Sequence, residues 1–356
     1  MKTTPTSSQV HGSAILSLGL LHAVFIFSLL AYDQYQGIIL ETHRLDRYGH
    51  FLEIWSLVWA VAVPPLAGWL ADRYSFTHGK KYLVINVAAT ITSLLFVLVA
   101  STFSLRSGAG LARMLPFLMA AWILGMHFFH SPSHSFVREF APPKDWPLAN
   151  ALILLIGNLI FALSALIVPF VQSLGVVFTF VAGGVLLGLA TFWFIRKSKT
   201  VGEHEPESEE PVRKTNWVWS ILTGLLVGSA FFVTSYAVLH TQAGSTAPAT
   251  QKSLIFVLAA LVAVPMGWYS KKTGAKKMLL VSAMAFGLFG VGGLFLFRSG
   301  FAWLDLVLMA ACLGAMESCG LPLALSKTLA RNKGLSTGLY WSGFYLISFL
   351  FFFFAP

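Results

Sequence analysis

Charged residues are scarce in this chain of 356 residues, because aspartate, glutamate, lysine and arginine together make up only 11% of it. Apolar residues make up 56% and aromatic residues 14%. A water-soluble fold with so little charge would expose large apolar patches, whereas a lipid bilayer is a solvent in which such surface is stable. The composition therefore excludes an ordinary soluble domain and indicates a protein embedded in a bilayer.

Cysteine is also scarce, and no motif for covalent chemistry is present. Cys312 and Cys319 are the only two cysteines and lie in one apolar run, so neither a disulfide framework nor a cysteine zinc site is indicated. The chain lacks the glycine-rich phosphate loop that ATP-driven pumping requires. We expect no enzymatic activity, no cofactor and no resident metal.

Long apolar runs are abundant instead. A helix needs about 20 apolar residues to cross a bilayer core about 30 Å thick. Runs of this kind predict an all-α, polytopic membrane protein with spans at residues 12–31, 51–71, 82–103, 114–136, 148–171, 174–195, 217–239, 253–270, 278–297, 302–325 and 336–355.

One connection between the runs is long and polar. Residues 197–216 carry glutamates between basic residues and have no apolar periodicity, which is typical of a flexible linker. The sequence therefore predicts an N-terminal transmembrane half at 1–196 with six spans, a linker at 197–216 and a C-terminal half at 217–356 with five spans.

The net charge of +10 comes from short basic clusters between the runs rather than from one basic face or tail. This distribution argues against a nucleic-acid partner. Most of the 24 lysines and arginines fall in the loops on the same side as the N-terminus. Because such loops are usually cytoplasmic, we expect a cytoplasmic N-terminus in a plasma or inner membrane.

Two loops have related sequences, and both follow the second run of their half. The first contains Gly68, Asp72, Arg73, Gly79 and Lys80. The second contains Gly267, Gly274 and a basic cluster at 271–277. An internal repeat with matching topology is typical of transporters built from two related halves around a central site.

The first loop resembles the signature loop of the major facilitator superfamily, Gly-x-x-x-Asp-Arg-x-Gly followed by two basic residues. It departs from the pattern by four extra residues before Gly79, and the second copy has Lys271 and Lys272 in place of the acidic–basic pair. The resemblance implies two pseudo-symmetric halves of six-helix type, here without a twelfth span. It also implies alternating access, with the loop acting as a latch that holds the cytoplasmic side closed.

In that fold the first, fourth, seventh and tenth spans line the central cavity. Ionisable and polar residues within spans are functional candidates by default. The candidates for binding substrate or protons are His22, His127, His130, Tyr236 and Glu317. His127 and Glu317 occupy similar positions in the two halves and form the preferred pair. A structural role as hydrogen-bonded core residues is the alternative for His22 and Glu317.

The fourth run carries a row of histidines. His127, His130 and His134 follow at i, i+3 and i+7 and share one helix face. Imidazoles bind transition metals, but the rise along a helix lets only the first two reach one ion unless another helix helps. A polar row facing the cavity is the other interpretation.

The sequence thus predicts a secondary active transporter, with ion or proton coupling, that moves a small organic solute by alternating access. Aromatic residues in the cavity-lining runs would suit a partly apolar solute, or they face lipid. Two alternatives stay open: an exporter of transition metals through the fourth-span histidines, and a non-transporting sensor or assembly protein that has kept the fold. We expect a monomer whose partners are the bilayer, a small-molecule solute and a coupling ion such as the proton.

Overall fold

The structure, a computed structural model, describes residues 10–79, 82–105, 110–201, 215–240, 248–296 and 302–354. All regular secondary structure in these ranges is helical. The first group of helices is α1 (Gly12–Thr42), α2 (Gly49–His78), α3 (Leu83–Phe103), α4 (Leu115–His134), α5 (Val137–Phe140), α6 (Trp146–Ala162) and α7 (Ser164–Thr200). The second group is α8 (Trp217–His240), α9 (Pro248–Thr273), α10 (Ala275–Leu296), α11 (Ala302–Ser326) and α12 (Lys333–Phe354). Short 3-10 turns precede α2, α4, α6 and α12.

The helices confirm the predicted all-α, polytopic fold. Ten of the helical segments in the described ranges are long and apolar enough to cross a membrane, and α10 coincides with the remaining predicted run. Large apolar side chains such as Leu166, Met284 and Leu288 are about two-thirds exposed or more, at 70%, 67% and 71%. Such surface is stable in lipid. The chain is therefore a multi-pass membrane protein.

The boundary between the fifth and sixth predicted runs is a backbone kink. The fifth run is formed by α6 together with the first part of α7, and at Gly175 the chain takes φ 74° and ψ 167° before α7 continues. Only glycine adopts this conformation readily. α7 then runs to Thr200, four residues into the predicted linker, and most of the rest of that linker, 202–214, lies outside the described residues.

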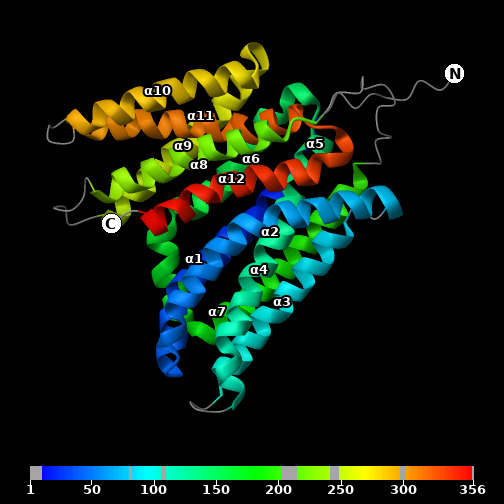
Figure 1. Cartoon of the computed structure of the whole chain (residues 1–356), viewed down its shortest axis with the longest axis vertical. Helices are drawn as coiled ribbons and strands as arrows, with labels where there is room; N and C mark the ends of the chain where they lie inside the picture. Colours follow the sequence, from blue (N-terminus) through cyan, green and yellow to red (C-terminus); the bar gives the residue numbers. More distant parts are fainter. Residues whose placement is uncertain are drawn as a thin grey trace.

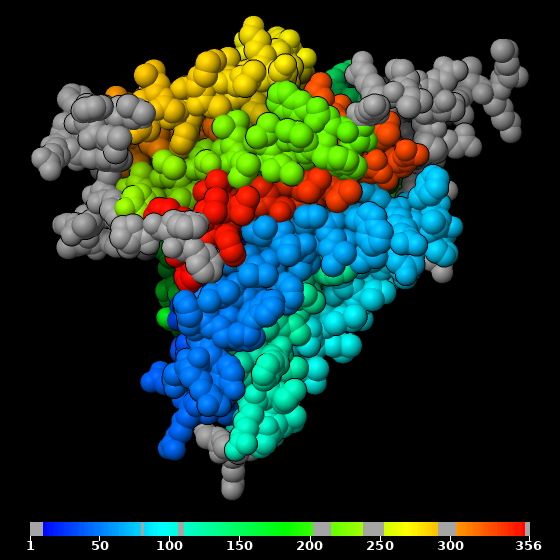
Figure 2. Space-filling view, viewed as in Figure 1, coloured from blue at the N-terminus to red at the C-terminus, as the bar shows by residue number. Residues whose placement is uncertain are grey.

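The two groups of helices form two halves that meet along two pairs of long helices. α2 packs along α12, and α6 packs along α9, so the second helix of each half meets the fifth span of the other. In Figure 1 the ribbons of the two halves lie close together where α2 ends and α12 begins, and they diverge toward the opposite end. In Figure 2, α12 lies directly against α2.

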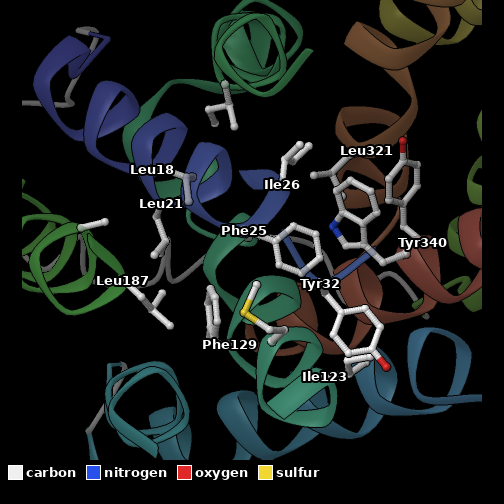
Figure 3. Packing of buried hydrophobic residues seen from close by; sticks show 14 of the residues in the cluster. Leu18, Leu21, Phe25, Ile26, Tyr32, Ile123, Phe129, Leu187, Leu321 and Tyr340 are labelled. Atoms are coloured by element: carbon white, nitrogen blue, oxygen red, sulfur yellow. The ribbon is translucent and has the colours of Figure 1, made fainter. Parts of the chain in front are cut away.

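Aromatic packing fills the inside of the first half. The Trp122 ring on α4 is fully buried against Phe96 of α3, at 4.8 Å between ring centroids, and against Phe180 of α7, at 5.5 Å. Figure 3 shows Phe25 of α1 pointing toward α4 and the second half. Tyr32 of α1 packs on the same Trp122 ring at 5.1 Å between centroids, so this packing holds α1 and α4 together with the histidines they carry.

Candidate functional site

Three histidines come together between α1 and α4. His22 of α1 and His130 of α4 face each other, with 3.1 Å between His22 Nδ1 and His130 Nε2. His134, one turn further along α4, joins them, so that one ligand nitrogen from each of the three lies within 4.8 Å of the others. All three side chains are buried, with exposures of 4%, 1% and 0%. The structure thus supplies the second helix that a shared ion would need.

Close packing fixes the orientations of the histidine rings. The His130 ring stacks on Phe25, with 3.8 Å between centroids and 12° between planes. Behind His22, α6 carries Gly157, where a Cβ atom would lie only 2.4 Å from His22 Cδ2. A glycine inside a helix costs about 1 kcal/mol relative to alanine. Its position here is explained by the room that the His22 ring requires.

The second half covers the cluster. Trp341 of α12 lies with its ring centroid 4.7 Å from that of His130 and 5.3 Å from that of His134. Trp341 is itself buried, with 5% exposure. The ligand nitrogens therefore all belong to the first half, whereas one wall around them belongs to the second.

His127, predicted beside His130, lies outside this group. It points toward Phe25 and toward Tyr345 of α12, at 5.7 Å and 5.3 Å between ring centroids. No hydrogen bond or ion pair among the described residues joins it to Glu317, its predicted partner. A helix rises about 1.5 Å per residue, so His127 lies about 4.5 Å along α4 from His130, on the side away from His134. His22 therefore meets His130 and His134 rather than His127.

Glu317 joins the two halves near the middle of α11. Its Oε2 accepts a hydrogen bond from Asn158 Nδ2 of α6 at 2.7 Å, and its backbone carbonyl accepts another from Asn150 Nδ2 at 2.9 Å. The glutamate is 4% exposed. Within the described part of the chain, no lysine, arginine or histidine forms an ion pair with it. Asn158 is not among the predicted site residues. Its place as a polar amide inside an apolar run could have identified it as a candidate.

Tyr236 lies apart from these groups. Its side chain is 40% exposed, and its ring packs on Phe351 of α12 at 5.4 Å between centroids. The structure brings together His22 and His130 but not Tyr236 and Glu317. The residues that the sequence proposes for one cavity are thus divided among separate places.

The first loop contacts the start of α12. Asp72 accepts hydrogen bonds from the backbone amides of Gly334 and Leu335, both at 2.8 Å. These amides have no partner within α12 because they lie in its first turn. A Cβ atom on Gly68 would lie within 2.1 Å of Gly334 O, so only glycine allows this approach. Asp72 with Gly68 thus fastens the end of α2 to the other half.

The second loop makes the equivalent contact with different chemistry. Lys271 at the end of α9 forms an ion pair with Asp145, 2.6 Å between Nζ and Oδ1, just before α6 begins. A Cβ atom on Gly267 would lie 2.8 Å from Pro147 O. Each loop therefore holds the second helix of its half against the start of the fifth span of the other.

Further contacts join the halves at this end, which we call the basic end because Arg138, Lys271 and Lys333 lie there. Arg138 Nη1 donates to Thr328 O at 2.7 Å and to Leu325 O at 3.4 Å. Lys333 contacts the Glu139 carboxylate. Sequence patterns gave no signal for these pairs, since their members are more than 180 residues apart.

The other predicted latch residues have smaller roles. Arg73 is exposed, with its guanidinium 5.4 Å from the centroid of the Trp69 ring. Gly79 and Gly274 take positive φ values of 64° and 83° at the ends of α2 and α9, where glycine commonly ends a helix. Lys80 lies outside the described residues.

Three solved structures have the same arrangement of helices. The proton:xylose symporter XylE matches with a TM-score of 0.68 and 14% identity, over 96% of this chain and 87% of that one. A bacterial homologue of the iron transporter ferroportin, in an outward-facing state, matches with a TM-score of 0.69 and 12% identity, over 98% and 93%. The E. coli fucose:proton symporter FucP matches with a TM-score of 0.61 and 13% identity, over 96% of this chain and 92% of that one.

At these identities the structures establish the fold alone. No curated protein matches the sequence closely enough to count as a relative. The family model described as Major Facilitator Superfamily matches residues 13–352, which is nearly the whole chain. The sequence match and the two related halves agree, and the chain belongs to the Major Facilitator Superfamily.

Proposed function

We propose that the chain moves a small solute across a membrane by alternating access, and that Glu317 couples this movement to a proton. The contact between Glu317 and Asn158 is the observation that carries the proposal. An ionised carboxylate away from water is costly unless a cation or proton neutralises it. Because the partner amide belongs to the other half, a change in the charge of Glu317 changes a bond that the halves share.

The direction of the molecule in the membrane follows from its basic residues. Loops rich in lysine and arginine usually face the cytoplasm, so the basic end, with its many contacts between the halves, is the cytoplasmic end. Closure at that end corresponds to a state in which the cytoplasmic route is shut. The membrane that we propose is a plasma or inner membrane.

An organic solute with an apolar part fits the side chains between the halves. Phe231 of α8, Phe256 of α9 and Phe161 of α6 contact one another, with ring centroids 5.3–6.0 Å apart. Aromatic rings bind apolar groups through their large contact area. The sequence-based expectation of an organic solute therefore stays the first candidate.

A transition-metal ion is the second candidate cargo, favoured by one specific observation. His22, His130 and His134 each offer a ring nitrogen within one small volume. Imidazole is a preferred ligand of zinc, copper and nickel. Cargo of this kind would not use the aromatic contact area.

The experiment uses the full chain in liposomes that enclose a pH-sensitive dye. Sugars, amino acids, organic acids, amphiphiles and Zn²⁺ are added outside in turn, and proton movement is recorded. Glu317→Gln keeps an oxygen for Asn158 but has no proton to exchange, so we expect its solute-driven proton movement to fall by about tenfold or more. The control is Asp305→Asn, which removes another buried carboxyl of α11. Full proton movement in Glu317→Gln, or none with any solute in the unmodified protein, would contradict the proposal.

A further inference from the structure

The cluster of His22, His130 and His134 contains ring nitrogens with no protein partner. His130 Nδ1 and His134 Nε2 are buried, and neither has a hydrogen-bond partner among the described residues. A buried polar atom left without a partner costs about 1–3 kcal/mol. His130 turns its other nitrogen, Nε2, toward His22, and the unpartnered His134 Nε2 indicates that something outside the protein chain binds within the cluster.

The tautomer of His134 can be assigned from its contact with the backbone. His134 Nδ1 lies 3.1 Å from His130 O, which is a carbonyl oxygen and only accepts. Nδ1 therefore carries the proton, and the lone pair is on Nε2, the nitrogen without a partner. Histidines that bind metals usually donate their other ring nitrogen to a carbonyl or carboxylate in this way. His134 thus has the state of a metal ligand.

The spacing of the nitrogens fits one ion. Nitrogens about 2.1 Å from a tetrahedral zinc ion lie about 3.4 Å from each other. The distance from His22 Nδ1 to His130 Nε2 is 3.1 Å, and the group as a whole lies within 4.8 Å. Small rotations of buried rings bring the third nitrogen into range.

We propose that His22, His130 and His134 form a binding site for a divalent transition-metal ion of the zinc, nickel or copper type. Three neutral imidazoles without a carboxylate select these ions over magnesium and calcium, which prefer oxygen ligands. Three protein ligands leave a fourth position open for water or an exchanging ligand. An open position suits an ion that enters and leaves.

The location of the site connects it with the movement of the halves. All three ligands belong to α1 and α4, whereas Trp341 of α12 covers them from the second half. Separation of the halves uncovers the ligands without pulling them apart. Metal binding itself rests on the histidine geometry, and a role of the ion as cargo rests on the proposed transport function.

The test is calorimetric titration with ZnCl₂ of the full chain, purified with a tag free of histidine and treated with a chelator. We expect one Zn²⁺ per chain in the unmodified protein and no binding of Mg²⁺. Each of His22→Ala, His130→Ala and His134→Ala is expected to weaken binding about tenfold or more, since a lost ligand costs at least as much as a lost supporting contact.

His127→Ala is the matched control, because His127 is a buried histidine of the same helix outside the group. We expect its Zn²⁺ affinity to stay within about threefold of the unmodified protein, because no hydrogen bond among the described residues joins His127 to a proposed ligand, and tenfold effects come from ligands and their hydrogen-bonded partners. Absence of saturable Zn²⁺ binding, or an equal loss in His127→Ala, would overturn the proposal.

A second measurement covers variants that fail to fold. X-ray absorption of the unmodified protein loaded with Zn²⁺ should show nitrogen ligands at about 2.0–2.1 Å together with the additional scattering of imidazole rings. A spectrum without imidazole scattering would exclude histidine ligands. Zn²⁺ binding without Zn²⁺ movement in liposomes would leave the site in place and count against metal as the cargo.

Discussion

The two loops that fasten the halves at the basic end have the same position but different chemistry. In the first, the Asp72 carboxylate binds two backbone amides at the start of α12. In the second, Lys271 binds the Asp145 carboxylate that precedes α6. The sequence difference between the copies, an acidic residue against a lysine, therefore reflects two ways to bind the start of a helix.

The two contacts differ in strength because their chemistry differs. Asp72 satisfies two amides that have no other partner within the helix, and Gly68 brings the backbones into direct contact. The Asp145 side chain is buried, at 6% exposure, but the Lys271 side chain keeps 30%, so water and salt reach this ion pair from the lysine side and weaken it. We therefore expect the first latch to contribute more to closure of the basic end.

The largest expected effect comes from the glycines. Gly68→Val places carbon atoms where Gly334 O lies and prevents close approach of α2 to α12, so the basic end should be mostly open. Gly267→Val should act in the same direction more weakly, because its nearest backbone atom would be 2.8 Å rather than 2.1 Å away. Spin labels at Thr77→Cys and Arg331→Cys, in a background with Cys312→Ala and Cys319→Ala, report the separation by pulsed electron resonance. Equal opening in the two variants would show that the latches are equivalent.

A smaller effect is expected from the polar side chains. Asp72→Ala removes two hydrogen bonds to a charged group, each worth about 1.5–3 kcal/mol, and should favour the open basic end by at least about 2 kcal/mol. Lys271→Ala should favour it by less, about 1–2 kcal/mol, because it leaves the buried Asp145 carboxylate without its cation but the pair is already open to water on the lysine side. The same pair of labels measures the populations, and Asp72→Asn should recover part of the loss. The comparison fails if Lys271→Ala has the larger effect.

Exchanging the charges of Lys271 and Asp145 should change the separation of the halves at this contact only slightly. Lys271→Asp alone places two carboxylates together and opens this contact, whereas Lys271→Asp with Asp145→Lys restores an opposite pair. Labels at Lys144→Cys and Lys272→Cys across the contact should give a distance distribution for the double variant close to that of the unmodified protein. A double variant as open as the single one would mean that Lys271 acts through something other than Asp145.

The smallest effect is that of salt. Raising the ionic strength from about 0.1 M to about 1 M shortens the screening length from about 10 Å to about 3 Å. The Lys271–Asp145 contact should loosen slightly, while the Asp72 contact, made with backbone amides, should stay unchanged. Both label pairs measured in one salt series provide the test.

Much of this fold is predictable because each span is a local property of the sequence. The apolar runs place eleven helices, and the repeated glycines at 68 and 267 mark where backbones meet. The partners of these glycines are not predictable from local patterns. Gly334 lies 266 residues from Gly68, and Asp145 precedes Lys271 by 126 residues, so only the packed structure brings them together.

The candidate site was also only partly predictable from local sequence patterns. Spacing along α4 indicates a shared face for its histidines, yet which two of them meet His22 depends on the rotation of α1 against α4. Phe25 and Gly157 set that rotation through packing, which the sequence pattern does not reveal. Glu317 was predicted to pair with His127 by symmetry of position, whereas the hydrogen-bonding partner in the structure is Asn158.

The bond between Glu317 and Asn158 also bears on leakage. In the proposed transport cycle, a movement that separates Asn158 from Glu317 must break this bond, so the bond would add to the activation barrier between the two conformations. Under the proposed proton coupling, such a barrier would slow futile cycling, in which protons cross without cargo. Asn158→Ala, which removes the amide, would then change conformation faster and let more protons cross per solute moved.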